Sequence, residues 1–258
     1  MKFGICFSAQ EALEIEMYDA DYLELSAWSV NTLTDEEFER LKGRVERGEI
    51  RTYSCNGLVD PDCRLTGEGV DFNAIREYCE RVFERLAQLG ITMLVFGSSK
   101  AKRVPEGFPF EKAWEQLKQV GEIFSDCAAK HGQTIAIEPL SYAEVNIINT
   151  LGDAADYSRL VNRENYKILA DFYHVDNNKE DFATFETYKD LLMHTHIATA
   201  GTRCMPQNDE DWAFFERCIA TLKKIGYQGN ISFEGKRNEG NEGVAEMIAR
   251  MRRIYAEV

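Results

Sequence analysis

The sequence lacks the signatures of a disulfide-rich protein or a zinc-ribbon protein. Its seven cysteines are scattered from Cys6 to Cys218 and form no C-x-x-C pair. An odd number of widely spaced cysteines argues against both a disulfide framework and a structural zinc site. We therefore expect reduced thiols and a cytoplasmic protein.

Long apolar runs and an excess of basic residues are also absent. No window approaches the ~18 apolar residues that a membrane-spanning helix needs, and the amino terminus does not resemble a signal peptide. The chain has 30 Lys and Arg against 44 Asp and Glu, which gives a net charge of −14. Because this field repels phosphates and anionic lipids, we expect neither nucleic acid nor membrane as a partner.

Nucleotide-binding glycine motifs are missing as well, since neither G-x-G-x-x-G nor G-x-x-x-x-G-K-[ST] follows a strand pattern. What the 258 residues do contain is a regular alternation of short apolar runs and amphipathic segments. Eight runs are typical of strands covered on both faces. They are Lys2–Cys6, Tyr22–Leu25, Arg51–Cys55, Met93–Phe96, Thr134–Glu138, Lys167–Asp171, Met193–Ile197 and Asn230–Glu234.

The segments between these runs carry helix signals. A capping box at Thr34–Glu37 opens one helix, and Gly90 and Gly226 are typical of residues that end helices. Helices are expected over Asp71–Leu89, Asp209–Ile225 and Glu242–Ala256. A further helix has Pro109 in its first turn and closes at His131-Gly132. Less regular helical patterns lie at Glu11–Ala20 and Asp181–Leu191. Eight strand–helix repeats predict an α/β fold, a parallel eight-stranded (β/α)8 TIM barrel, as a single domain over residues 1–258.

Polar residues stand at the ends of the last four predicted strands, where a barrel carries its catalytic groups. Glu138 ends TIAIE, Asp171 ends KILAD, His196 lies near the end of MHTHI, and Glu234 ends NISFE. Neighbouring strands lie ~4.8 Å apart, so these side chains can converge on one ion. Three carboxylates and one imidazole suit Mn²⁺, Mg²⁺ or Co²⁺ with open positions for a substrate.

Each of these residues also has an ordinary structural interpretation. A lone glutamate before a loop is usually solvated, and a lone aspartate at a strand end usually caps the next helix. The coincidence on four consecutive strands favours a metal site. His194 shares a face with His196 but lies deeper, and we interpret it as structural. For Glu24, a cap or surface role is as good an interpretation as a place in the barrel mouth.

A basic loop, Ser98–Arg103, follows the fourth predicted strand. It could hold a carboxylate or a phosphate, but a solvated loop is the favoured interpretation.

Local strings around these positions resemble a known family. They are Ile137–Leu140 with Glu144 and Asn149-Thr150, Asp171–His174, His194–Ile197 with Arg203, and Phe233–Gly235. The sequence resembles the xylose isomerase-like TIM-barrel superfamily of sugar phosphate isomerases and epimerases, and within it the ketose epimerases of the D-tagatose 3-epimerase type. The resemblance covers residues 93–234 densely and the first half only in its strand pattern.

This resemblance implies roles for individual residues. Glu138, Asp171, His196 and Glu234 would be ligands of one divalent ion, with Mn²⁺ expected before Mg²⁺ or Co²⁺. Glu138 and Glu234 would also be the catalytic acid–base pair. Glu144, His174 and Arg203 would contact the oxygens of a sugar substrate. Relatives commonly form dimers or tetramers, so a homo-oligomer is expected.

The expected activity is that of a sugar isomerase or epimerase that abstracts a proton beside a carbonyl and forms an enediolate. The family often has Asn-Arg where this chain has Ser141-Tyr142. Because these residues lie in a substrate-facing loop, the sequence does not identify the sugar substrate. One alternative is a metal-dependent lyase that acts by β-elimination on a 3-keto sugar or glycoside. A more remote alternative is an AP-endonuclease-like hydrolase with three zinc ions. Such a zinc cluster needs many histidines, and this chain has only four.

Overall fold

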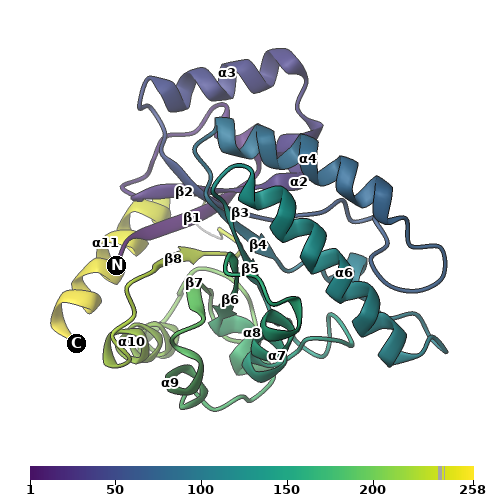
Figure 1. The fold of residues 1–258 in the computed structure, drawn as a ribbon. Helices are drawn as coiled ribbons and strands as arrows, with labels where there is room; N and C mark the ends of the chain where they lie inside the picture. The colour runs from purple at the N-terminus through teal and green to yellow at the C-terminus, as the bar shows by residue number, and fades with distance from the viewer. Residues whose placement is uncertain (238–239, 241) are drawn as a thin grey trace.

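The computed structural model describes residues 1–237, 240 and 242–258. Eight parallel strands close into a barrel in sequence order, and β8 pairs with β1 (Figure 1). The strands are β1 (Phe3–Phe7), β2 (Tyr22–Ser26), β3 (Thr52–Asn56), β4 (Met93–Phe96), β5 (Thr134–Ile137), β6 (Tyr166–Asp171), β7 (Leu192–Ile197) and β8 (Asn230–Phe233). The predicted TIM barrel is confirmed.

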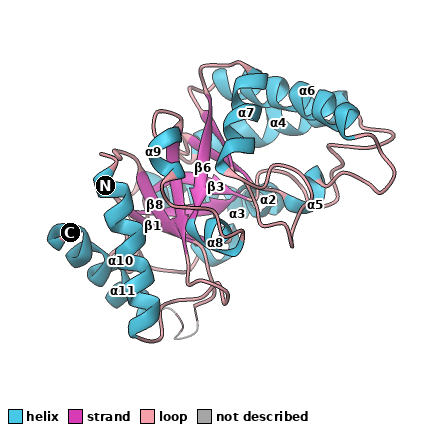
Figure 2. Ribbon diagram, turned by 90° about the horizontal axis from the view of Figure 1, so that it is seen from below, coloured by secondary structure: helices cyan, strands magenta, loops and turns pink. Residues whose placement is uncertain are grey.

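Helices surround the strands, which lie at the centre of the molecule in Figure 2. The helices are α1 (Ala9–Ala12), α2 (Ala27–Thr32), α3 (Asp35–Glu46), α4 (Phe72–Gln88), α5 (Ser99–Lys102), α6 (Phe110–Ala129), α7 (Leu151–Val161), α8 (Phe172–Asn177), α9 (Thr184–Tyr188), α10 (Asp209–Lys224) and α11 (Glu242–Glu257). None of the helices in this described part of the chain is long and apolar enough to cross a membrane.

Several predicted helix boundaries are wrong. The helix expected over Glu11–Ala20 ends at Ala12, and the following loop places Tyr18 and Asp19 in the left-handed region at φ 47° and 61°. Pro109 is the N-cap of α6 and not a residue of its first turn, because its ψ of 128° is extended. The helix expected over Asp181–Leu191 shortens to α9.

The sequence analysis missed α7 and the short helices α2, α5 and α8. Helix α7 begins with a capping box in which the Thr150 side chain accepts from the Asp153 backbone and Asp153 accepts in return. Aspartate takes the place that glutamate or glutamine usually has in this motif. Four- to six-residue helices are too short to show a helical period.

Apolar faces of the helices pack on the outside of the strands. For example, Phe124 of α6 contacts the rings of Phe83 and Phe96 at 6.1 and 5.0 Å between centroids. The inside of the barrel differs, because polar residues replace many of the branched aliphatic ones that usually fill it. The fully buried polar residues there are Glu24, Ser54, His194, His196 and Ser232. This polar interior lies directly beneath the candidate site.

Candidate metal and substrate site

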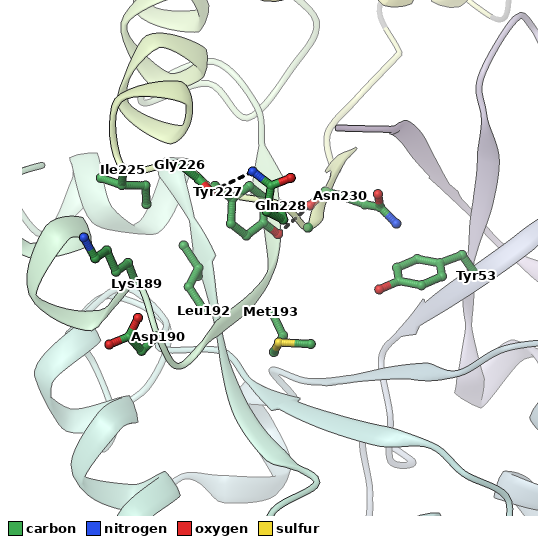
Figure 3. Close-up of a pocket in the computed structure, with 11 residues that line it drawn as sticks. Tyr53, Lys189, Asp190, Leu192, Met193, Ile225, Gly226, Tyr227, Gln228 and Asn230 are labelled. Atoms are coloured by element: carbon green, nitrogen blue, oxygen red, sulfur yellow. Dashed lines mark hydrogen bonds between the residues drawn. The ribbon is translucent and has the colours of Figure 1, made fainter.

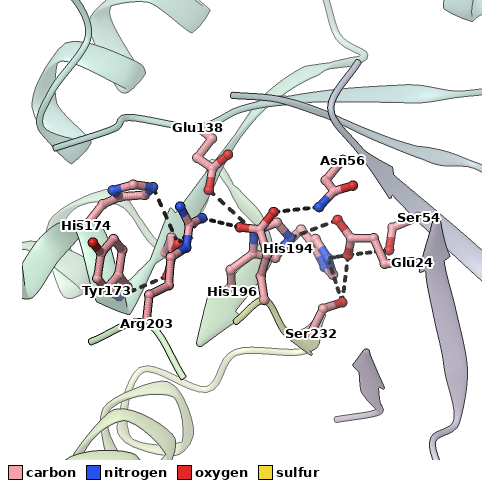
Figure 4. A network of polar contacts seen from close by, with 12 residues as sticks. Glu24, Ser54, Asn56, Glu138, Tyr173, His174, His194, His196, Arg203 and Ser232 are labelled. Atoms are coloured by element: carbon pink, nitrogen blue, oxygen red, sulfur yellow. Dashed lines mark hydrogen bonds and ion pairs between the residues drawn. The ribbon is translucent and has the colours of Figure 1, made fainter. Parts of the chain in front are cut away.

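Glu138, Asp171, His196 and Glu234 come together at the carboxyl ends of β5 to β8. One ligand atom from each lies within 4.8 Å of all the others. His196 Nδ1 is 3.4 Å from Glu138 Oε1 and 3.2 Å from Glu234 Oε2 (Figure 4). Glu138 and Glu234 are the residues just after β5 and β8, so the strands end one residue earlier than predicted.

The donor atoms of this cluster fit a divalent cation. Glu138 Oε1, Asp171 Oδ2 and His196 Nδ1 are buried and have no hydrogen-bond partner among the described residues. Unpaired buried polar atoms are costly and rare, so three that face one another call for a ligand. Carboxylate oxygens and one imidazole nitrogen are donors that such ions accept.

Asp171 serves two purposes at once. Its Oδ1 accepts the backbone N–H of Tyr173 at 2.9 Å and so caps α8. Its Oδ2 turns toward the cluster. The capping interpretation of a strand-end aspartate and the metal-ligand interpretation are therefore compatible.

The backbone of Glu138 is held by α5, the short helix after β4. Lys102 Nζ donates to the Glu138 backbone oxygen at 2.8 Å, and the ammonium lies 5.5 Å from the centre of the Phe96 ring. Lys102 is fully buried, and burial lowers its pKa to about 7. For Lys102, the prediction of a solvated basic loop is wrong, because this side chain turns inward to a carbonyl that only the folded chain brings near.

Gly97 leaves room for the Glu138 carboxylate. A Cβ added at Gly97 would overlap Glu138 Oε2.

We expect Gly97→Ala to push the flexible Glu138 carboxylate out of the cluster and to lower kcat about 100-fold, which is the effect of a misplacement near 1 Å. Gly43→Ala in α3 is the matched control, since its Cβ meets only the end of the Arg47 side chain. Steady-state kinetics of both variants check this, and equal activity would contradict it.

Arg203, His174 and Glu144 border the same cluster. Arg203 Nη2 donates to Glu234 Oε2 at 2.6 Å and lies 3.6 Å from Asp171 Oδ2. Arg203 Nη1 is 3.7 Å from Glu144 Oε1. The structure thus brings all three predicted substrate-binding residues beside the four predicted ligands. Their contact with a substrate stays a prediction.

His174 presents a hydrogen-bond donor to the site. Its Nδ1 accepts the backbone N–H of Ser141 at 3.1 Å, so a neutral ring carries its proton on Nε2. Burial lowers the pKa of His174 to about 4, which keeps the ring neutral near pH 7. Nε2 lies 3.6 Å from Asp171 Oδ2 and has no hydrogen-bond partner in the described chain.

The sequence analysis missed one polar residue of the site, Asn56, and left the place of Glu24 open. Asn56, at the end of β3, donates from Nδ2 to Glu234 Oε1 at 2.5 Å. Its place at a strand end was the available signal. Glu24 is fully buried within the barrel and accepts from His194 and His196, so the cap and surface interpretations are wrong. His194 lies on Glu24 and not on the cluster, in agreement with its predicted deeper place.

A separate pocket lies at the opposite end of the barrel. Figure 3 shows it between Tyr53, Met193, Tyr227 and Asn230, near the amino-terminal ends of β3, β7 and β8. No metal-binding group of the described residues lies there. The candidate chemistry is therefore at the carboxyl end, where barrels of this type carry their active sites.

The fold and the cluster define a class, a (β/α)8 barrel with a possible divalent-metal site at the ends of its last four strands. Residues 13–254 match the family model described as xylose isomerase-like TIM barrel. The chain belongs to that family.

Its relatives are sugar epimerases. The chain is 27% identical over 259 residues to a ketose 3-epimerase of Arthrobacter globiformis, across 98% of this chain and 83% of that protein. It is 29% identical over 167 residues to 3-dehydro-D-guloside 4-epimerase of Escherichia coli (strain K12), across 61% of this chain and only 62% of that enzyme. A solved L-ribulose 3-epimerase superposes with a TM-score of 0.81 at 17% identity, across 99% and 95% of the two chains, which supports the fold.

Proposed function

We propose that the protein is a divalent-metal-dependent sugar isomerase or epimerase that removes a proton beside a carbonyl. The observation that carries this proposal is the cluster of Glu138, Asp171, His196 and Glu234, three of whose ligand atoms are buried without a hydrogen bond among the described residues. Relatives named ketose 3-epimerase and 3-dehydro-D-guloside 4-epimerase support a ketose or a 3-keto sugar derivative as substrate.

The positions of the two glutamates support a two-base exchange. They follow β5 and β8, with β6 and β7 between them, so they approach the space above the cluster from two sides. One carboxylate would take the proton from the substrate carbon and the other would return a proton to the opposite face. A divalent ion bound there would supply Lewis acidity toward the substrate oxygens.

The surrounding residues suit these roles. Burial raises the pKa of Glu234, but the neighbouring His196 and Arg203 more than offset it and hold the pKa well below its ordinary value. Glu234 is therefore ionised near neutral pH, as a metal ligand must be. The His174 Nε2–H and the Arg203 guanidinium are donors that would stabilise charge developing on an enediolate oxygen.

Metal binding should weaken as the pH falls below neutral. Burial raises the pKa of Asp171 to about 7. The positive charge of Arg203 opposes this increase, while the negative charges of Glu138 and Glu234 add to it. Burial alone would lower the pKa of His196. The negative charges of Glu24 and Glu234 outweigh burial, so the net pKa of His196 is above its ordinary value. Both groups must lose a proton to become ligands, so Mn²⁺ affinity should fall about tenfold or more per pH unit below pH 7.

Calorimetric titration with Mn²⁺ at pH 6 and pH 8 measures this pH dependence. Repeating each titration in two buffers of different ionisation enthalpy gives the number of protons released. An affinity that stays constant between the two pH values would contradict the expected competition between Mn²⁺ and protons.

Product analysis tests the reaction itself. A panel of ketoses and 3-keto sugars would be incubated with the protein and Mn²⁺ in D₂O and followed by NMR, with EDTA-treated protein as the control. We expect either an epimer that carries deuterium at the carbon that lost its proton or an aldose–ketose isomer that carries deuterium at the neighbouring carbon that gained one. A released leaving group would instead indicate β-elimination, and no reaction with any sugar of the panel would count against the proposal.

A further inference from the structure

Glu24 is a carboxylate buried at the centre of the barrel, one layer below the candidate metal cluster. It lies on β2 with no exposed surface. Four donors satisfy it, as Figure 4 shows. Oε1 is bonded to His196 Nε2 at 2.8 Å, and Oε2 accepts from His194 Nε2, Ser54 Oγ and Ser232 Oγ at 2.8, 2.7 and 2.6 Å.

The bond from Oε1 fixes which nitrogen of His196 faces the cluster. Because a carboxylate accepts hydrogen bonds, the Nε2 of His196 must carry the proton of this contact. The lone pair for a metal is then on Nδ1, which lies 3.4 Å from Glu138 Oε1 and 3.2 Å from Glu234 Oε2. The ring orientation and the tautomer that a ligand histidine needs are set by the same bond.

The three bonds to Oε2 fix the carboxylate from behind. Ser54 is on β3, while His194 and Ser232 are on β7 and β8, so the donors reach Glu24 from separate strands. Tyr22 Oη extends this network to Ser232 Oγ at 2.8 Å. A Cβ at Gly4 would overlap the Tyr22 ring, so glycine at this position is what admits the tyrosine.

A role in packing alone does not account for this arrangement. Aliphatic side chains usually fill the interior of such barrels, and they need no partners. A buried charge is often no more stabilising than a well-packed apolar group of the same size. What Glu24 supplies and an apolar side chain cannot is an acceptor for four buried donors, one of which is the Nε2 of His196.

We propose that Glu24 is a positioning residue that holds His196 with its Nδ1 lone pair toward the metal. The proposal rests on the function proposed above, since it assumes that His196 is a ligand. Glu24 acts through His196 and contacts neither substrate nor ion.

Metal affinity tests the proposal on variants of the full chain. Glu24→Gln keeps the size of the side chain but removes its charge, and we expect Mn²⁺ binding measured by calorimetry to weaken 10- to 100-fold. Ser54→Ala is the matched control, because it removes a donor to Oε2 from the same buried network but leaves the bond to His196. Its Mn²⁺ affinity should change less than about threefold.

A spectroscopic measurement on the unmodified protein needs no variant. Nitrogen NMR of the histidine rings, with assignments from His194→Gln, should show His196 with a proton on Nε2, both in EDTA and with Mg²⁺ bound. A proton-free Nε2 on His196 would overturn the proposal. This measurement keeps it testable even if Glu24→Gln fails to fold.

The outcomes separate the two proposals. If the unmodified protein binds no Mn²⁺, the proposed function fails. If the unmodified protein binds Mn²⁺ and folded Glu24→Gln binds it equally well, the metal site stands and the positioning role of Glu24 is overturned. Melting curves in EDTA show whether each variant is folded.

Discussion

Replacing either Glu138 or Glu234 by glutamine should lower the rate of epimerisation by about 10³-fold or more. Each glutamate is proposed both to hold the metal and to move a proton, and loss of a general acid or base alone typically costs 10²- to 10⁴-fold. The two losses should differ in one respect. A variant with one remaining base should still exchange the proton of one epimer with D₂O, while the other epimer should keep its proton.

This asymmetry is measured by NMR of each epimer in D₂O with saturating Mn²⁺. Glu111→Gln is a suitable control, because Glu111 is an exposed residue of α6 and its charge change leaves the site untouched. A Glu138→Gln or Glu234→Gln variant that epimerises at the normal rate would defeat the assignment. Loss of exchange from both epimers in both variants would argue for a metal role without a two-base mechanism.

Replacing Asp171 by asparagine should separate metal binding from folding. Asparagine caps a helix about as well as aspartate, so the hydrogen bond to the Tyr173 backbone should persist and the metal-free variant should unfold with nearly the same free energy. Because the single oxygen of asparagine would keep the capping bond, an uncharged amide nitrogen that cannot bind a metal would take the place of Oδ2. A thousandfold excess of Mn²⁺ over its Kd stabilises a folded protein by about 4 kcal/mol, and this gain falls to about 1.4 kcal/mol if the Kd rises a hundredfold.

Denaturant unfolding with EDTA and with Mn²⁺ measures both quantities. Asp71→Asn is the matched control, since Asp71 caps α4 by the same type of bond but is exposed and is not part of the cluster. It should keep the full stabilisation by Mn²⁺. If Asp171→Asn kept it too, Asp171 would be a cap and nothing more.

The barrel and four of its strand-end residues could be predicted from the sequence because the signals are local. Short apolar runs define the strands, and Glu138, Asp171, His196 and Glu234 interrupt or end them. Once the runs are counted as eight, the geometry of a barrel places their ends together. The metal and substrate roles of these residues remain predictions.

Glu24 and Lys102 could not be placed from the sequence, because their partners are distant along the chain. Both faces of a barrel strand are buried, so the alternation in Tyr22–Ser26 does not say which face carries a charge. The partners of Glu24 are on β3, β7 and β8, and Lys102 reaches a backbone carbonyl at Glu138. No spacing in the sequence encodes these contacts.

The shared acceptor at the barrel centre also limits how this protein can diverge. His194, His196, Ser54 and Ser232 all donate to Glu24, so an apolar residue at position 24 would remove the shared acceptor of four buried donors. Removing one partner of a buried bond is costly, whereas removing all of them together can be nearly neutral. Substitutions inside the barrel should therefore be tolerated only in concerted sets, while exposed residues outside the site stay free to change one at a time.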